Sequence, residues 1–318
     1  MSCGVSADDL KRRQALPLDV KVNLTKGRIR QWYEHYHGDV YVSFSGGKDS
    51  TVLLDIVKGM YPEVPAVFCD TGLEYPEVRE FAIENADEVL RPDMNFKQVI
   101  ETYGYPFPSK EQALYIRQYR HSTEKMRKLR WEGNQSNGRF AIAKKWRYLV
   151  DAPFELSEQC CDVMKKRPFK RFEREKELKP MIGTMAEESR LRFQEYLQHG
   201  CNSFSEKRAK STPLGFWTEQ DVLGYLKQTG IGYASCYGDI VEDNGKLVNT
   251  GVHRTGCMFC LFGIYAEHEP NRFQRMQREH PKQYDYCINK LGIGEVLDYV
   301  GIPYEYQPTL FDVGGDGL

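Results

Sequence analysis

The fold is decided by the segment Val40-Tyr41-Val42-Ser43-Phe44-Ser45-Gly46-Gly47-Lys48-Asp49-Ser50. Its apolar start predicts a strand, and the apolar run at 51–57 predicts a helix after it. The two glycines between them allow a tight turn with positive φ. Such a turn directs several backbone N–H groups to one spot, where the helix dipole favours negative charge. Lys48 adds a positive charge, so we expect a polyphosphate ligand, although Gly-Gly turns also join strands to helices without one.

Strand and helix patterns alternate beyond this segment. We expect further strands at 66–69, 88–90 and 179–184, and a helix that begins at Pro76. This order predicts an α/β fold with a Rossmann-like, parallel twisted sheet flanked by helices. Ligands of such sheets bind at the carboxyl ends of the strands. Residues 45–47 and 70–72 both follow strands, so we expect them to line one crevice.

The chain divides by pattern into three parts. Residues 1–37 are a helical lead-in, and residues 38–265 form the main domain. A helical, basic insertion at about 104–160 interrupts this domain and carries no clear strand. Residues 266–318 are a helical segment and an irregular tail. We expect the fold to include a C-terminal portion that is ligated by cysteines.

Charge is nearly balanced over the 318 residues, with a formal net charge of −1, so no overall basic field indicates nucleic acid. Lysine and arginine nevertheless gather in residues 110–147 and 165–179. These stretches are either solvated helix faces or a basic wall that faces a polyanion.

The sequence contains no apolar run of about 20 residues, the length that spans a bilayer, and no secretory leader. We therefore expect a cytoplasmic protein with no membrane contact. Nine cysteines in that reducing compartment favour metal binding or catalysis over structural disulfides.

Four of the cysteines form two pairs. Cys160 and Cys161 are adjacent, and Cys257 and Cys260 form a Cys-x-x-Cys motif. Together they supply four thiolates, the number that a [4Fe–4S] cluster or a zinc site requires. The alternative is a set of buried free thiols, which behave as small apolar side chains.

Several motifs in this order resemble one known family. Ser45 to Ser50 resembles the PP-loop of N-type ATP pyrophosphatases, and Asp70 to Glu77 resembles the Asp-Thr-Gly segment of phosphoadenosine phosphosulfate (PAPS) reductases. Gly183 to Arg190 and Pro213 to Leu226 resemble two further segments of the PAPS reductase, or adenine nucleotide alpha-hydrolase-like, family. The four paired cysteines resemble those of cluster-bearing adenylylsulfate reductases. The resemblance covers about residues 38–265.

The chain also departs from the sulfonucleotide reductases. They usually lack the Lys-Asp of the loop, whereas this chain keeps Lys48 and Asp49. They carry a catalytic cysteine in the C-terminal tail, whereas the last cysteine here is Cys287. Met185 stands where the family often has arginine. The first two departures favour an ATP-cleaving relative that is similar to the ATP pyrophosphatases of DNA phosphorothioation systems, whereas Met185 bears on a single phosphate or adenine contact.

The resemblance implies a set of site residues. Lys48, Asp49 and Asp70 would be catalytic, with ATP, Mg²⁺ and a [4Fe–4S] cluster (or zinc) as cofactors. Cys160, Cys161, Cys257 and Cys260 would ligate the metal. The nucleotide would contact Ser43, Ser45, Gly46, Gly47, Lys48, Asp49, Ser50, Asp70, Thr71, Gly72, Gly183 and Arg190, with Arg192 as a further phosphate candidate.

The implied activity is cleavage of ATP to AMP and pyrophosphate, with adenylation of an acceptor in a sulfur-transfer pathway. The acceptor would be DNA, reached through partner proteins, with a cysteine desulfurase or another sulfur-donor protein as a partner. The basic stretches would guide the DNA backbone, with Trp131, Tyr148 and Tyr119 as stacking or packing groups. The alternatives are a PAPS or adenylylsulfate reductase that releases sulfite, a PP-loop tRNA thiolase, and a non-catalytic nucleotide-sensing subunit.

Overall fold

The computed structural model describes residues 4–205 and 209–307. They form two compact units. Unit 1 takes the chain up to Pro92 and the segment Lys165–Thr255, and unit 2 takes Asp93–Met164 and the chain from Gly256 onward. The three expected parts of the chain, 1–37, 38–265 and 266–318, stay a prediction, and the tail from residue 308 lies outside the described residues.

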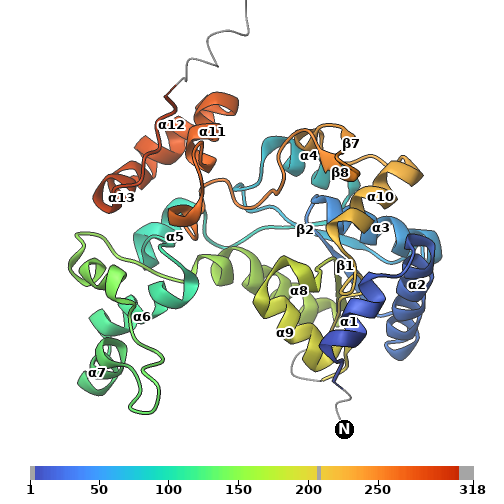
Figure 1. Cartoon of the computed structure of the whole chain (residues 1–318), viewed down its shortest axis with the longest axis horizontal. Helices are drawn as coiled ribbons and strands as arrows, with labels where there is room; N and C mark the ends of the chain where they lie inside the picture. The colour runs from blue at the N-terminus through green and yellow to red at the C-terminus, as the bar shows by residue number, and fades with distance from the viewer. Residues whose placement is uncertain (1–3, 206–208, 308–318) are drawn as a thin grey trace, which may run out of the picture. The chain divides into compact units, whose positions relative to one another are not determined.

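Unit 1 is built on one sheet of six strands. Their spatial order is β3-β2-β1-β4-β6-β5. Figure 1 labels β1 and β2 of this sheet. β1 pairs in parallel with β2 and β4, and the other pairs are parallel as well, except for β5 with β6. The strands are β1 Val40–Phe44, β2 Ala66–Cys69, β3 Glu88–Leu90, β4 Lys179–Ile182, β5 Asn202–Ser203 and β6 Lys210–Ser211. The expected α/β fold with a mostly parallel sheet is therefore confirmed.

Helices cover both faces of this sheet because side chains alternate along β1. Val40 and Val42 pack into a core that includes Trp32 of α2, Leu53 of α3 and Val222 of α10. On the other face, Tyr41 and Val67 pack against Phe172 of α8. The helices of unit 1 are α1 Ala7–Gln14, α2 Leu18–His35, α3 Lys48–Met60, α4 Pro76–Asn85, α8 Arg167–Lys176, α9 Arg190–His199 and α10 Glu219–Thr229.

Shorter elements complete unit 1. β7 Ile240–Asp243 and β8 Lys246–Asn249 form an antiparallel hairpin. The 3-10 turns η3 and η4 span Ala186–Glu188 and Ser235–Tyr237. The π-helical turn η2, Asp162–Lys166, begins in unit 2, passes into unit 1 at Lys165 and leads into α8.

Unit 2 consists mainly of helices. Phe107 and Leu149 are fully buried in the first of its two segments, as are Phe273 and Val296 in the second. Its elements are α5 Phe96–Tyr103, α6 Lys110–His121, α7 Glu124–Glu132, η1 Lys144–Asp151, η5 Ile264–Ala266, α11 Arg272–Glu279, α12 Pro281–Asp285, η6 Tyr286–Lys290 and α13 Ile293–Val300. Among the described residues, no helix combines the length and apolar character that a membrane crossing needs.

Candidate functional site

The turn between β1 and α3 is shaped by glycine and serine. Gly46 has a φ of +71°, and a Cβ there would lie 2.6 Å from the backbone oxygen of Val78 in α4. The Ser50 hydroxyl donates to the Gly47 carbonyl at 2.9 Å, and the Ser45 N–H donates to Ser50 Oγ at 3.2 Å. These bonds hold the turn closed on itself and place Gly47 at the N-cap of α3. The predicted strand–turn–helix is therefore confirmed.

Lys48 is buried at this helix start. Only 5% of the residue is exposed, and its Nζ donates to Glu219 Oε1 at 2.5 Å and to the His253 carbonyl at 3.1 Å. The ammonium also lies 5.7 Å from the centre of the Tyr237 ring. A buried ammonium requires such a partner. A phosphate that binds Lys48 would therefore compete with the carboxylate of Glu219 for the ammonium.

Asp49 follows Lys48 in the sequence, and its carboxyl is also influenced by the charges of Lys48 and Glu219. Its Oδ1 is buried, with no hydrogen-bond partner among the described residues. Burial raises the pKa of Asp49 to about 6, an effect opposed by Lys48, Arg254 and Arg192 and reinforced by Glu219. A carboxylate oxygen without a partner inside the protein is the kind of ligand that Mg²⁺ prefers.

The segment after β4 closes against the first turn of α3. A Cβ on Gly183 would lie 2.9 Å from the backbone oxygen of Asp49, so only glycine allows this approach. Arg192 of α9 forms an ion pair with Glu188. Burial lowers the pKa of Arg192, whereas the charge of Asp49 raises it. Arg192 thus places a guanidinium near the start of α3.

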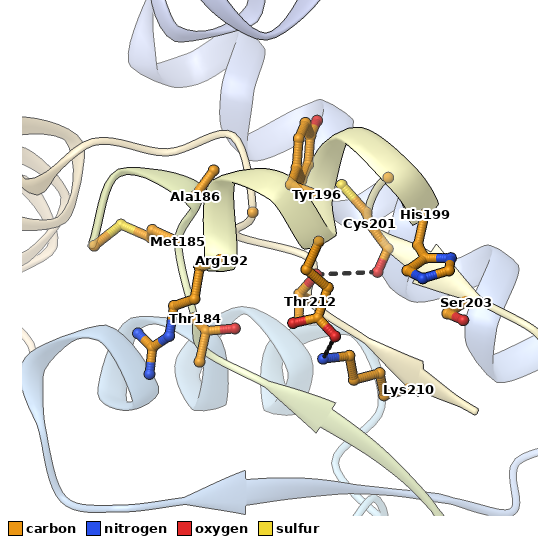
Figure 2. A pocket seen from close by; sticks show the side chains of 13 residues that line it. Thr184, Met185, Ala186, Arg192, Tyr196, His199, Cys201, Ser203, Lys210 and Thr212 are labelled. Atoms are coloured by element: carbon orange, nitrogen blue, oxygen red, sulfur yellow. Dashed lines mark hydrogen bonds and ion pairs between the residues drawn. The ribbon is translucent and has the colours of Figure 1, made fainter. Parts of the chain in front are cut away.

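A cavity of about 20 Å³ lies beside Arg192. Figure 2 shows Arg192 next to Thr184 at one end of this cavity and His199 and Cys201 at the other. The Thr212 N–H donates to the Cys201 carbonyl at 2.7 Å. A cavity of that volume has room for about one water molecule and not for a nucleotide. It therefore marks the interior beneath α9 and not the adenosine site.

Asp70 follows β2 and is held by an arginine. Arg79 donates to both of its carboxylate oxygens, each at 2.8 Å, and these bonds lower the pKa of Asp70. Gly72, with a φ of +70°, donates its N–H to Asp70 Oδ1 at 3.3 Å. The Thr71 hydroxyl donates to Glu74 at 2.7 Å. In this structure Asp70 therefore binds Arg79 of α4, and Thr71 binds within the turn itself. This turn lies at the same edge of the sheet as the β1–α3 turn.

Two predicted residues lie apart from these contacts. Ser43 is inside β1, where it faces Val67 and Ile182 in the strand register. Arg190 is exposed at the first residue of α9. Their contact with a nucleotide stays a prediction.

The paired cysteines come together in unit 2. The pKa of Cys160 is raised first by its hydrogen bond with Cys161, then by burial and by the charges of Cys161, Cys257 and Cys260. Burial also raises the pKa of Cys260, whose carbonyl accepts from Arg272 at 2.8 Å. In residues 4–205 and 209–307, however, no group of three or more His, Cys, Asp or Glu side chains is arranged to hold a metal ion. The donor set fits a cluster in number and kind, but not in its present arrangement, so the ligand assignment stays a prediction.

The structure adds residues that the sequence did not single out. Glu219 begins α10, and its N–H donates to Glu187 Oε1 at 2.5 Å. Tyr237 Oη lies 2.5 Å from Thr255 Oγ1, a hydrogen bond beside Lys48. Glu219 is 171 residues from Lys48 along the chain, and no local pattern joins the two. The one signal is that Glu219 lies within the segment Pro213 to Leu226 that resembles the family, where it is half-buried in the first turn of α10.

The parallel sheet and the glycine turn at the end of β1 define a Rossmann-like α/β protein. Residues 39–135 and 118–261 match the model of the phosphoadenosine phosphosulfate reductase domain. The chain belongs to this family, which confirms the resemblance seen in the motifs. Its members act on nucleotides or sulfur.

Individual relatives are distant. The chain is 25% identical over 278 residues to an uncharacterized protein of Methanocaldococcus jannaschii, covering 83% of this chain but only 44% of that protein. It is 24% identical over 253 residues to the adenosine 5'-phosphosulfate reductase of Staphylococcus epidermidis, covering 77% and 81% of the two chains. The crystal structure of PAPS reductase from Candida auris aligns with a TM-score of 0.40 at 14% identity, covering 78% of this chain and all of that one.

Proposed function

We propose that this chain is a cytoplasmic ATP pyrophosphatase that adenylates an acceptor in a sulfur-transfer pathway, with a DNA phosphate as the acceptor. The observation that carries the proposal is the group of charges at the start of α3. Lys48 and Asp49 stand there together with Arg192 and Arg254. A sulfonucleotide has no pyrophosphate to release, so a buried Lys-Asp pair on the loop is better suited to ATP.

In the proposed reaction, an acceptor oxygen attacks the α-phosphorus of ATP. The bond between that phosphorus and the oxygen bridging to the β-phosphate breaks, and pyrophosphate leaves with the electron pair. The acceptor phosphate becomes a mixed phosphoric anhydride with AMP. Hydrosulfide delivered by a donor protein can then attack the acceptor phosphorus, so that a P–S bond forms as the P–O bond to AMP breaks and AMP leaves with the electron pair. Catalysis of this kind depends mainly on positioning and on stabilising the charge of the leaving group.

Each residue of the turn has a role in this scheme. The N–H groups at the start of α3 bind phosphate oxygens, and Lys48 moves from Glu219 to the leaving pyrophosphate. Asp49 would hold Mg²⁺ through its unpartnered oxygen, and the ion would offset charge on the phosphates. Glu219 neutralises Lys48 when no phosphate is present, so the buried ammonium is never left alone. No step of this scheme uses the cysteines, and a [4Fe–4S] cluster or zinc on them is a separate part of the proposal.

The test is to incubate anaerobically purified protein with ATP, Mg²⁺ and an oligonucleotide acceptor. AMP and pyrophosphate are the expected products, and ADP with phosphate would contradict the proposal. Lys48→Ala should remove most of the pyrophosphate release while the chain stays folded. Lys58→Ala is the matched control, because Lys58 lies on the same helix but is partly exposed and pairs with Asp87 at 2.8 Å.

A second candidate is a sulfonucleotide reductase, favoured by the similarity to the adenosine 5'-phosphosulfate reductase of Staphylococcus epidermidis. Release of sulfite from adenylylsulfate or PAPS in the presence of thioredoxin would decide for this activity. The absence of sulfite, together with pyrophosphate formed from ATP, would decide for the first.

A further inference from the structure

Unit 2 carries a group of exposed aromatic rings that alternate with cations around η1. Trp146 and Leu149 anchor η1 in the core, with 9% and 0% exposure. The neighbouring Tyr148 remains 42% exposed. Because Trp146 and Leu149 pack in the core, the side chains on the opposite side of η1, such as Tyr148, lie at the surface. We call this surface the η1 platform; it consists of Trp131, Lys145, Arg147, Tyr148, Tyr265 and Tyr299.

Residues distant in sequence complete the platform. Tyr148 stacks on Tyr299, with ring centres 6.0 Å apart and planes 26° from parallel. Lys145 Nζ lies 4.6 Å from the centre of the Tyr265 ring. Arg147 lies 4.3 Å above the Trp131 ring and donates to the Trp131 carbonyl at 2.5 Å. Trp131, Tyr265 and Tyr299 are 36%, 41% and 41% exposed, so each offers part of its surface to solvent.

Positive charge outnumbers negative charge in the segment that carries most of the platform. Residues 110–151 contain eleven lysines and arginines but only four aspartates and glutamates. Lys144 and Lys145 are both exposed on η1 itself. A surface of exposed rings and excess positive charge fits a ligand that has planar groups and a negative backbone.

We propose that the η1 platform binds single-stranded nucleic acid. Exposed rings can stack only on bases whose faces are open, and in a duplex those faces are covered by neighbouring base pairs. A protein partner would also use tyrosine and tryptophan, but the excess of lysine and arginine favours a polyanion. This inference deepens the proposed function, because the platform would hold the nucleic acid acceptor.

The test uses the full chain and a fluorescein-labelled single strand of twenty deoxythymidines, followed by fluorescence anisotropy. Binding should weaken as salt rises, and a duplex of the same length should bind more weakly. The double variant Tyr148→Ala/Tyr299→Ala should bind roughly 5- to 150-fold more weakly, as expected from the loss of one stacked base. The double variant with phenylalanine at both positions should bind like the wild type, because its rings still stack.

Tyr286→Ala is the matched control, since Tyr286 is 45% exposed in the same unit but lies outside the platform. An RNA strand of the same length distinguishes a ribonucleotide acceptor from DNA. Equal or tighter binding of the duplex, or unchanged binding by the alanine variant, would overturn the proposal. If the double alanine variant does not fold, Tyr265→Ala alone gives the same comparison. Lys48→Ala should bind the strand normally, so a failure of the ATP chemistry and a failure of the platform give different results.

Discussion

Replacing Asp49 with asparagine should stabilise the ligand-free chain and at the same time abolish its activity. The pKa of Asp49 is about 6, against 3.8 for an ordinary aspartate. Ionisation of this carboxyl therefore costs the folded chain about 3 kcal/mol at neutral pH. Asparagine has nearly the same shape and carries no charge, so it removes this cost. We expect a gain of about 1–3 kcal/mol in the free energy of unfolding, or roughly 1.5–4.5 °C in Tm.

The gain should depend on pH in a defined direction. A raised pKa means that the folded chain holds the proton more tightly than the unfolded chain does. The cost is therefore fully present above pH 6 and disappears as the pH falls through the interval between about 6 and 4. Asparagine does not titrate, so the difference between Asp49→Asn and the wild type should be large at pH 7.5 and small near pH 4.

The assay is thermal unfolding followed by circular dichroism, without ATP or Mg²⁺, at both pH values. Asp70→Asn is a control of opposite sign. The bonds from Arg79 lower the pKa of Asp70, so this change should destabilise the chain at pH 7.5 and have less effect as the pH falls below about 4. If Asp49→Asn lowers Tm, or raises it equally at both pH values, the assigned environment of Asp49 is wrong. If the variant still releases pyrophosphate at the wild-type rate, its assigned role is wrong.

Three further changes test other parts of the structure. Gly46→Ala should cost at least about 1–2 kcal/mol of stability from the left-handed backbone alone, and more from the contact with the Val78 carbonyl; chemical denaturation measures this. Lys21→Ala should cost about 3–5 kcal/mol of stability, because it leaves the Asp221 carboxylate without its cation. In the wild type the Lys21 ammonium lies 2.7 Å from a carboxylate oxygen of Asp221. Urea unfolding measures the loss, and an unchanged midpoint would contradict the prediction. Cys257→Ser should abolish the visible absorbance that a [4Fe–4S] cluster gives to anaerobically purified protein, because it removes one of the four proposed ligands. A colourless wild type that contains one equivalent of zinc would remove the cluster from the proposal.

The strand–turn–helix at the start of the sheet could be predicted because its signals are local. Apolar side chains in β1, a glycine pair and an apolar helix follow one another without a gap, and the Asp-Thr-Gly turn after β2 repeats the pattern. β5 and β6 could not be predicted, because strands of two residues contain no periodicity. Lys21 and Thr25 are polar, yet both are buried, because their partners are supplied by the segment 213–221 far along the chain.

The residues proposed to bind the phosphates could be predicted from the sequence. The ion pairs and hydrogen bonds that these residues make within the protein could not. Lys48 and Asp49 stand out from their position in the glycine turn between strand and helix, but Glu219 reaches Lys48 only through the packing of α10 beside α3. The adjacency of Cys160 and Cys161 and the spacing of Cys257 and Cys260 predict that the thiols gather. Spacing does not determine how the side chains orient once a helix or turn is formed around them, and the structure does not arrange them as a metal site.

The position of β1 between β2 and β4 has a consequence for synthesis of the chain. β2 ends at Cys69, whereas β4 begins only at Lys179. A ribosome adding about 5–20 residues per second needs roughly 5–20 s to make the intervening segment. During that interval one edge of β1 has no strand to pair with, and an apolar strand with an open edge can pair with a neighbouring nascent chain. Slower translation between these strands should therefore lower the yield of folded protein even when the sequence is unchanged.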